Sequence, residues 1–156
     1  MAQGKKSFTL DDLLPGGSTY HQLQPQNLYT AWWGDRLVDT DLDGCHEINP
    51  KDGSKKVLFT LSQLNQWLGA GEDSSVVHSC YNVEFPDGGQ PWVATVVSGK
   101  GKNGGKPTSI YTVVDFKSGK KVWEQEYPAD ATALDRSPSS NSLAFVRQHN
   151  LYVTTK

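Results

Sequence analysis

The sequence has few cysteines, little excess charge of either sign and no long apolar run, and each shortage excludes a class of protein. Its two cysteines, Cys45 and Cys80, are too few for a disulfide-dense scaffold and match no zinc-binding spacing, and the residues leave open whether they pair. A formal net charge of -2 gives no electrostatic footprint for nucleic acid or an anionic membrane. No stretch approaches the roughly 18 apolar residues of a membrane-spanning helix. We therefore expect a water-soluble folded domain with no nucleic-acid partner and no membrane-spanning segment.

The residues that are present favour strands and tight turns. Glycine (15 residues), tryptophan (5) and tyrosine (6) suit pleated surfaces and the corners between them. Strand-like segments recur at the spacing of sandwiches, barrels and propellers, at 28–33, 35–41, 55–61, 75–85, 91–97, 109–116, 120–127 and 131–137, followed by a hairpin within 137–153. Two short helical pieces interrupt them near 9–14, where Thr9 caps and Pro15 ends the helix, and at 62–68, between Ser62 and Gly69. The low-complexity stretch at 100–107 predicts a hairpin loop.

Internal repeats narrow the fold class. The segments INPKDGSKKVLF (48–59) and VDFKSGKKVWEQ (114–125) share one scheme, and NLYTAWW (27–33) and NLYVTTK (150–156) share Asn-Leu-Tyr. A propeller blade is a four-stranded meander of about 40 to 50 residues that must stack on its neighbours, and rings typically hold about 4 to 8 blades. We predict an all-β chain: a partial β-propeller of about three four-stranded antiparallel blades over residues 7–156, incomplete at its C-terminal end. Residues 1–6 are expected to be disordered or of cloning origin.

Three segments carry a resemblance to a known family. FTLDDLLPGG, NLYTAWWGDRLV and the closing SPSSNSLAFVRQHNLYV resemble the start of the N-terminal propeller of the dipeptidyl peptidase IV family of prolyl oligopeptidase-like serine peptidases. The resemblance covers residues 7–156. Ser139, Ser140 and Asn141 replace the Asp-Gly that the family usually has at this turn, a change that asparagine tolerates because it adopts left-handed backbone conformations readily.

The resemblance implies a function that belongs to a longer protein. The family's catalytic triad lies in an α/β-hydrolase domain C-terminal to the propeller, and no G-x-S-x-G motif occurs in this sequence. We therefore expect no catalytic residue and no cofactor here, but a propeller segment that gates and positions peptides for a peptidase that releases N-terminal dipeptides. The partners implied are a peptide substrate and the hydrolase domain. Where the family has a substrate-binding arginine, this sequence offers only Lys102 or Lys106, which lack the bidentate guanidinium.

The start of the chain and its exposed edge suggest two further expectations. The polar stretch after Met1 and Ala2 resembles a chain trimmed at a signal-peptidase site, so we expect a periplasmic or secreted location. An interrupted propeller leaves the edge of its last hairpin unpaired, so we expect this chain to self-associate.

One acidic segment has the order of ligands found in calcium loops. VDTDLDGCHEI contains three alternating aspartates, a glycine and a further acid, at Asp39, Asp41, Asp43, Gly44 and Glu47. The twelfth position of an EF-hand loop is Pro50 here, and no helices flank the segment. We therefore favour a polar turn and expect no metal. A calcium-organised propeller and a non-catalytic propeller that binds protein or glycan remain the alternative functions.

The tryptophans are expected to pack between blades rather than bind ligands. Trp32 and Trp33 are adjacent on a predicted strand, so their side chains should face opposite sides of the sheet.

Overall fold

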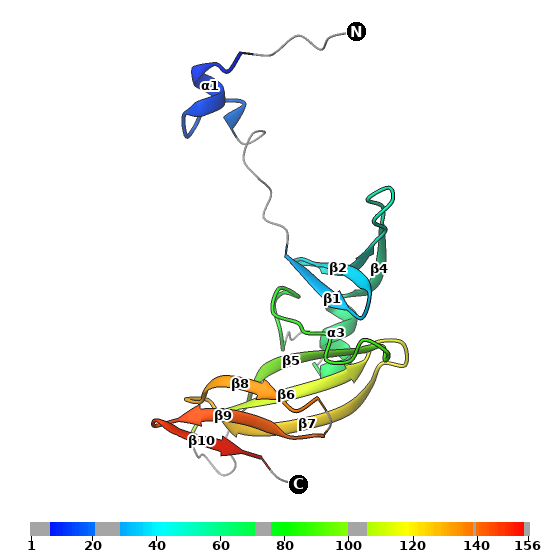
Figure 1. The fold of residues 1–156 in the computed structure, drawn as a ribbon, viewed down its shortest axis with the longest axis vertical. Coiled ribbons are helices and arrows are strands. Elements are labelled where there is room, and N and C mark those ends of the chain that lie inside the picture. Colours follow the sequence, from blue (N-terminus) through cyan, green and yellow to red (C-terminus); the bar gives the residue numbers. More distant parts are fainter. Residues whose placement is uncertain (1–6, 21–28, 71–75, 100–105, 139, 155–156) are drawn as a thin grey trace.

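The computed structural model describes residues 7–20, 29–70, 76–99, 106–138 and 140–154, which form three antiparallel sheets (Figure 1). The first sheet has β1 (Thr30–Trp33), β2 (Arg36–Thr40), β3 (Gly44–Ile48) and β4 (Lys55–Thr60), the second has β5 (Trp92–Gly99), β6 (Thr108–Asp115) and β7 (Lys120–Pro128), and the third has β8 (Thr132–Arg136), β9 (Leu143–Arg147) and β10 (Asn150–Val153). Strands adjacent in sequence pair within each sheet, so the predicted all-β meanders are confirmed. Among the described residues, however, the second and third sheets have three strands rather than four.

The two similar twelve-residue segments form equivalent hairpins. Ile48 pairs with Lys55 at the end of the β3–β4 hairpin, and Asp115 pairs with Lys120 at the end of the β6–β7 hairpin. In the second hairpin the Asp115 carboxylate accepts hydrogen bonds from the two backbone N–H groups that follow Phe116, at 2.9 and 2.8 Å. This side chain therefore closes the turn, as aspartate often does at such positions.

The longer helix follows directly from a strand. Helix α3 (Leu61–Leu68) has Thr60 as its N-cap: the Thr60 hydroxyl accepts from the Gln63 N–H at 3.2 Å, and the Gln63 side chain accepts from the Thr60 N–H at 2.9 Å. The prediction of Ser62 as the cap was wrong by two residues, because the last residue of β4 already serves as the cap. Gly69 ends the helix in a left-handed conformation (φ 88°), as predicted.

The shorter helix lies apart from the sheets (Figure 1). Helix α1 (Leu10–Leu13) is capped by Thr9, as predicted, and the Asp12 carboxylate accepts from the Thr9 N–H at 2.8 Å. Leu14 is extended (φ -97°, ψ 135°) because a residue before proline avoids the helical region. In the part of the chain that the structure describes, no helix is long and apolar enough to cross a membrane.

Two hydrophobic cores lie between successive sheets. The first joins the first sheet to the second through Trp33, Phe59 and Phe116, with the Trp33 and Phe116 rings edge-on at 5.0 Å. The second joins the second sheet to the third, for example through Tyr127 and Phe145, whose ring centroids are 6.0 Å apart. Aromatic contacts of this kind stabilise packing by about 1 kcal/mol beyond the area that they bury. The sheets therefore stack face to face, as blades do.

The adjacent tryptophans of β1 behave as predicted. The Trp33 side chain is 5% exposed and donates from Nε1 to the Gln90 carbonyl at 2.7 Å, whereas Trp32 is 66% exposed. The alternation of side chains along a strand places them on opposite faces of the first sheet.

The segment predicted as a strand at 75–85 is not one. Residues 76–85 form turns and irregular backbone, with a single bridge between Glu84 and Ala94. Its backbone groups bond elsewhere: the Cys80 N–H donates to the Asp41 carbonyl at 3.0 Å, and Asn65 binds the start of the segment. Residues 1–6 and most of the predicted loop at 100–107 lie outside the described residues.

Candidate functional site

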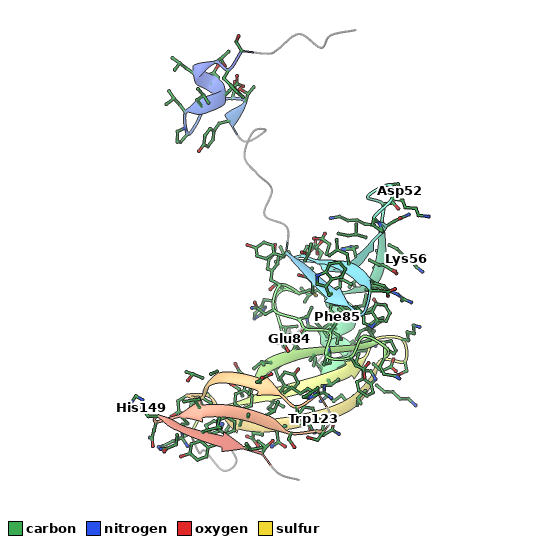
Figure 2. The ribbon with its side chains drawn as sticks, viewed as in Figure 1. Asp52, Lys56, Glu84, Phe85, Trp123 and His149 are labelled. Atoms are coloured by element: carbon green, nitrogen blue, oxygen red, sulfur yellow. The ribbon has the colours of Figure 1, made fainter. Side chains whose placement is uncertain are left out.

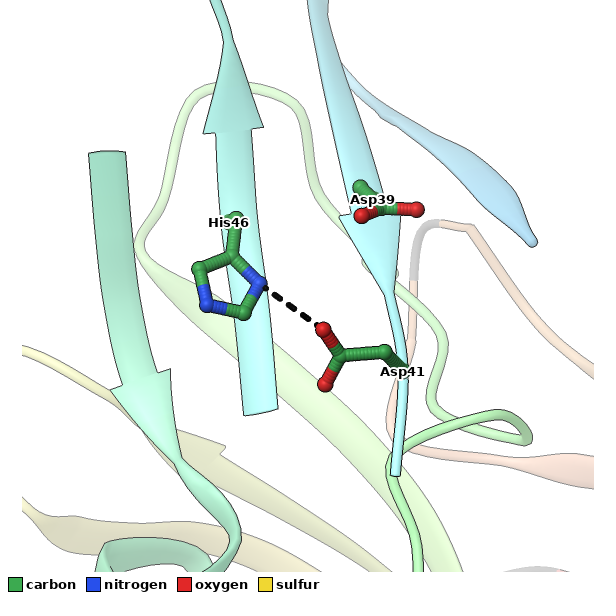
Figure 3. Close-up of side chains that lie close together, drawn as sticks. All are labelled: Asp39, Asp41 and His46. Atoms are coloured by element: carbon green, nitrogen blue, oxygen red, sulfur yellow. Dashed lines mark ion pairs between the residues drawn. The ribbon is translucent and has the colours of Figure 1, made fainter. Parts of the chain in front are cut away.

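The acidic segment of the sequence forms a cluster at one end of the first sheet (Figure 3). Asp39 lies on β2 directly opposite His46 on β3, and Asp41 follows β2 in the turn between them. One ligand atom from each of these three side chains lies within 4.8 Å of the others. His46 Nδ1 is 3.4 Å from an Asp41 carboxylate oxygen. Strand register therefore brings an imidazole and two carboxylates together.

Each carboxylate of the cluster already has partners in the protein. The buried Asp39 carboxylate pairs with the Lys55 ammonium, and this hydrogen bond raises the lysine pKa. One Asp41 oxygen accepts from the backbone N–H groups of Asp43 and Gly44, each at 2.8 Å, so the other faces His46. The two carboxylates are thus satisfied within the protein, Asp39 by a cross-strand ion pair and Asp41 by the turn that follows it. Cross-strand ion pairs stabilise sheets by a few tenths of a kcal/mol each.

The structure groups only part of the predicted calcium set. Asp39 and Asp41 belong to the cluster, whereas Asp43 does not and Glu47 lies 3.8 Å from the Arg36 guanidinium. His46, which was not part of the predicted calcium set, lies beside the two aspartates. A set of one imidazole and two carboxylates suits zinc or manganese better than calcium. The expectation that no metal binds here stays a prediction.

The signal for His46 was present but depended on a strand that was not predicted. The acidic segment from Asp39 to Glu47 was expected to form a polar turn, whereas the structure places its second half in β3. Once β2 and β3 are paired, Asp39 and His46 fall opposite each other, and directly opposite residues of an antiparallel pair lie close together.

A second candidate lies between the second and third sheets. A cavity of about 220 Å³ is lined by Glu84, Pro86, Tyr111, Leu134, Asp135, Arg136 and Pro138. The Tyr111 hydroxyl donates to the Glu84 carboxylate at 3.1 Å, and burial, followed by this charge, raises the tyrosine pKa above its usual value. Arg136 Nε is buried without a hydrogen-bond partner among the described residues, while its guanidinium lies 5.9 Å from the centre of the Trp123 ring. Mixed charge in so small a space indicates a water-sized or amino-acid-sized site at most.

The structure describes one of the two lysines predicted as weak substrate-binding candidates. Lys106 is exposed beside Pro107, and the shallow depression that it lines also contains Ala129 and Asp130. Lys102 lies outside the described residues. In Figure 2, His149 lies at the far end of the third sheet, away from Glu84 of the cavity described above.

Comparison with known proteins identifies a solved structure with a similar fold. No family model matches the chain. The chain is similar to the crystal structure of a putative dipeptidyl aminopeptidase IV from Bacteroides ovatus ATCC 8483, with a TM-score of 0.69 and 27% identity over 97% of this chain. It spans 20% of the length of that protein. The fold is that of a portion of a dipeptidyl aminopeptidase IV, consistent with the N-terminal propeller region, as the sequence motifs predicted.

Proposed function

We propose that this chain is a propeller segment of a dipeptidyl peptidase IV-like serine exopeptidase, and that it helps to gate and position peptides for a hydrolase domain carried on other residues. The observation that carries the proposal is the match over 97% of the chain to part of a putative dipeptidyl aminopeptidase IV. Two features of the chain support it: three stacked meanders with aromatic cores between them, and a sequence without the G-x-S-x-G motif of a serine hydrolase.

The proposal assigns the chemistry to another part of the parent protein. Peptide hydrolysis by such enzymes requires a serine nucleophile, a histidine base and an oxyanion hole held in one geometry. A propeller segment contributes by limiting which peptides reach that centre. The expected partners are therefore a peptide substrate and an α/β-hydrolase domain.

The direct test compares this chain with the longer protein that its reading frame encodes. Both are assayed with an Xaa-Pro dipeptide coupled to a chromogenic leaving group. We expect no turnover by the chain alone and turnover by the longer protein, abolished when the serine of its nucleophile elbow is replaced by alanine. Turnover by the chain alone, or a longer protein without a hydrolase motif and without activity, would refute the proposal. In the second case, binding to peptide or glycan arrays would favour a non-catalytic propeller.

We also propose that the chain self-associates through the outer edge of β10. This strand pairs only with β9 among the described residues, and Leu151 and Val153 on one of its faces are 71% and 59% exposed. Unpaired strand edges with apolar side chains favour pairing with another chain, and lysine on the edge opposes it. In sedimentation velocity, the average mass should rise with concentration, and Leu151→Lys with Val153→Lys should suppress the rise. Leu42→Lys, at a residue that is 53% exposed in the turn between β2 and β3, is the matched control and should leave the rise unchanged.

A further inference from the structure

Two cysteines meet inside the first hydrophobic core, although they are 35 positions apart in sequence. Cys45 and Cys80 are both fully buried, and both belong to the core between the first and second sheets. Cys45 lies on β3, directly opposite Thr40 of β2. Cys80 lies in the irregular segment 76–91, and its N–H donates to the carbonyl of Asp41, the residue after Thr40. The backbones of the two cysteines are therefore held against the same end of β2.

The two thiol groups belong to the same core and act on each other. Their mutual interaction, followed by burial, raises the pKa of Cys45, whereas the same interaction lowers the pKa of Cys80. The Cys80 thiol is thus the one that loses its proton more readily.

We propose that Cys45 and Cys80 form an intramolecular disulfide when this chain folds in the presence of a disulfide-containing oxidant. The thiolate of one cysteine attacks one sulfur of the oxidant's disulfide, and the other half of the oxidant leaves as a thiolate that takes up a proton. The thiolate of the second cysteine then attacks the protein sulfur of the mixed disulfide and releases the remaining half of the oxidant as a second thiol. The two cysteines lose two protons and two electrons, and the oxidant is reduced to two thiols.

The burial of both sulfurs determines when the bond forms. In the folded chain neither thiol is exposed, so an oxidant reaches them only while the segment 76–91 is still open. The periplasmic or secreted location expected from the sequence would provide an oxidant of this class during folding. The proposal itself requires only the oxidant.

The disulfide would fasten a segment that has little sheet pairing of its own. Between residue 76 and β5, the backbone pairs with a strand only at the bridge between Glu84 and Ala94. Joining residue 80 to β3 would hold this segment on the first sheet covalently. It would also constrain the unfolded chain, which is the main source of stability from a disulfide.

The test is oxidative refolding of this chain. The chain is unfolded and reduced, then refolded with a mixture of reduced and oxidised glutathione, and free thiols are blocked with N-ethylmaleimide under denaturing conditions. We expect a monomer that carries no maleimide, with a digest in which the Cys45 peptide is linked to the Cys80 peptide. The melting temperature should be higher than that of the reduced chain by about 10 °C, from the loop that the bond closes.

Control samples separate a disulfide from a merely structural role of the thiols. Cys45→Ala and Cys80→Ala should each retain one blockable thiol, and the double variant should melt at the same temperature with and without oxidant. The folded, reduced wild type should take up maleimide slowly until denaturant is added. Two maleimides on the refolded wild type, a mixed disulfide with glutathione as its end state, or a disulfide between two chains would overturn the proposal.

Discussion

Replacement of the buried Asn65 should release the segment that follows helix α3. The Asn65 side chain is 7% exposed and makes four hydrogen bonds. Its Oδ1 accepts from the N–H groups of Val76 (2.7 Å) and Val77 (2.9 Å), and its Nδ2 donates to the carbonyls of Val77 (2.9 Å) and Leu61 (3.2 Å). Three of these bonds reach Val76 and Val77, whose backbone groups pair with no strand among the described residues.

The expected cost follows from those three bonds. A hydrogen bond inside a protein contributes about 1 kcal/mol net, and a buried group that loses its partner costs somewhat more. Asn65→Ala should therefore lower the free energy of unfolding by about 3 kcal/mol and the melting temperature by roughly 6 to 12 °C. Denaturant titration measures the first quantity, and hydrogen exchange should show that the amides of Val76 and Val77 lose protection.

Asn82→Ala is the matched control, because it changes the same residue type at an exposed position of the same segment. It should alter stability by no more than about 0.5 kcal/mol. If Asn65→Ala costs as little as this control and leaves exchange unchanged, the reasoning is wrong. Apolar packing of the two valines, rather than the asparagine, would then hold the segment in place.

Three further predictions concern local geometry and ionisation. Gly119→Ala should lower the free energy of unfolding by about 2 to 4 kcal/mol, because Gly119 has φ 70° and a Cβ there would lie 2.6 Å from the Trp67 ring nitrogen. Gly53→Ala is the control: Gly53 has φ 71° but open space around it, so the loss should be about 1 kcal/mol. Equal losses in denaturant titration would exclude the clash. His149→Gly should stabilise the β9–β10 turn by about 0.5 to 1 kcal/mol in the same assay, since His149 has φ 63°, and a loss of stability would count against strain there. Burial raises the pKa of Tyr111 in the folded chain above its unfolded value of about 10. The stability that the protonated tyrosine contributes is therefore complete below pH 10 and is lost as pH rises through the folded-state pKa. Between about pH 9 and pH 11, the free energy of unfolding should fall less for Tyr111→Phe than for the wild type. An equal fall in the two proteins would contradict the raised tyrosine pKa.

Strand content was largely predictable because most strands are governed by local pattern. The segments 91–97, 109–116 and 120–127 alternate β-branched or aromatic residues between turn residues, and each lies within one or two residues of β5, β6 or β7. Thr9 and Gly69 were correct for a similar reason, since capping depends on a few neighbouring residues.

The two errors of strand assignment have one physical cause. The residues of β3 are not typical strand formers, and Gly44, Cys45 and His46 join the sheet because β2 and β4 flank them on both sides. The segment 76–85 has the apolar residues of a strand, but Asn65 and the Asp41 carbonyl take up its backbone groups instead. Both outcomes depend on contacts between distant residues, which override local propensity.

The candidate site was only partly predictable for the same reason. The sequence shows Asp39 and Asp41 as neighbours, but His46 joins them through the register of β2 with β3, and Lys55 reaches Asp39 from β4. A pattern of acids along the chain therefore suggested a cation site, whereas the folded sheet supplies much of the counter-charge itself.

The distribution of exposed apolar side chains distinguishes the middle sheet from the outer two. Strand β6 is buried on both faces, because Val114 packs in the first core while Tyr111 and Val113 pack in the second. In the first sheet, side chains such as Trp32 and Val57 are more than half exposed. In the third sheet, Leu151 and Val153 are also more than half exposed. At about 25 cal/mol per Å² of apolar surface, covering a few such side chains stabilises a stack by several kcal/mol. The middle sheet is covered on both faces and the outer two are not, which supports the proposed function, in which further blades would cover the outer sheets.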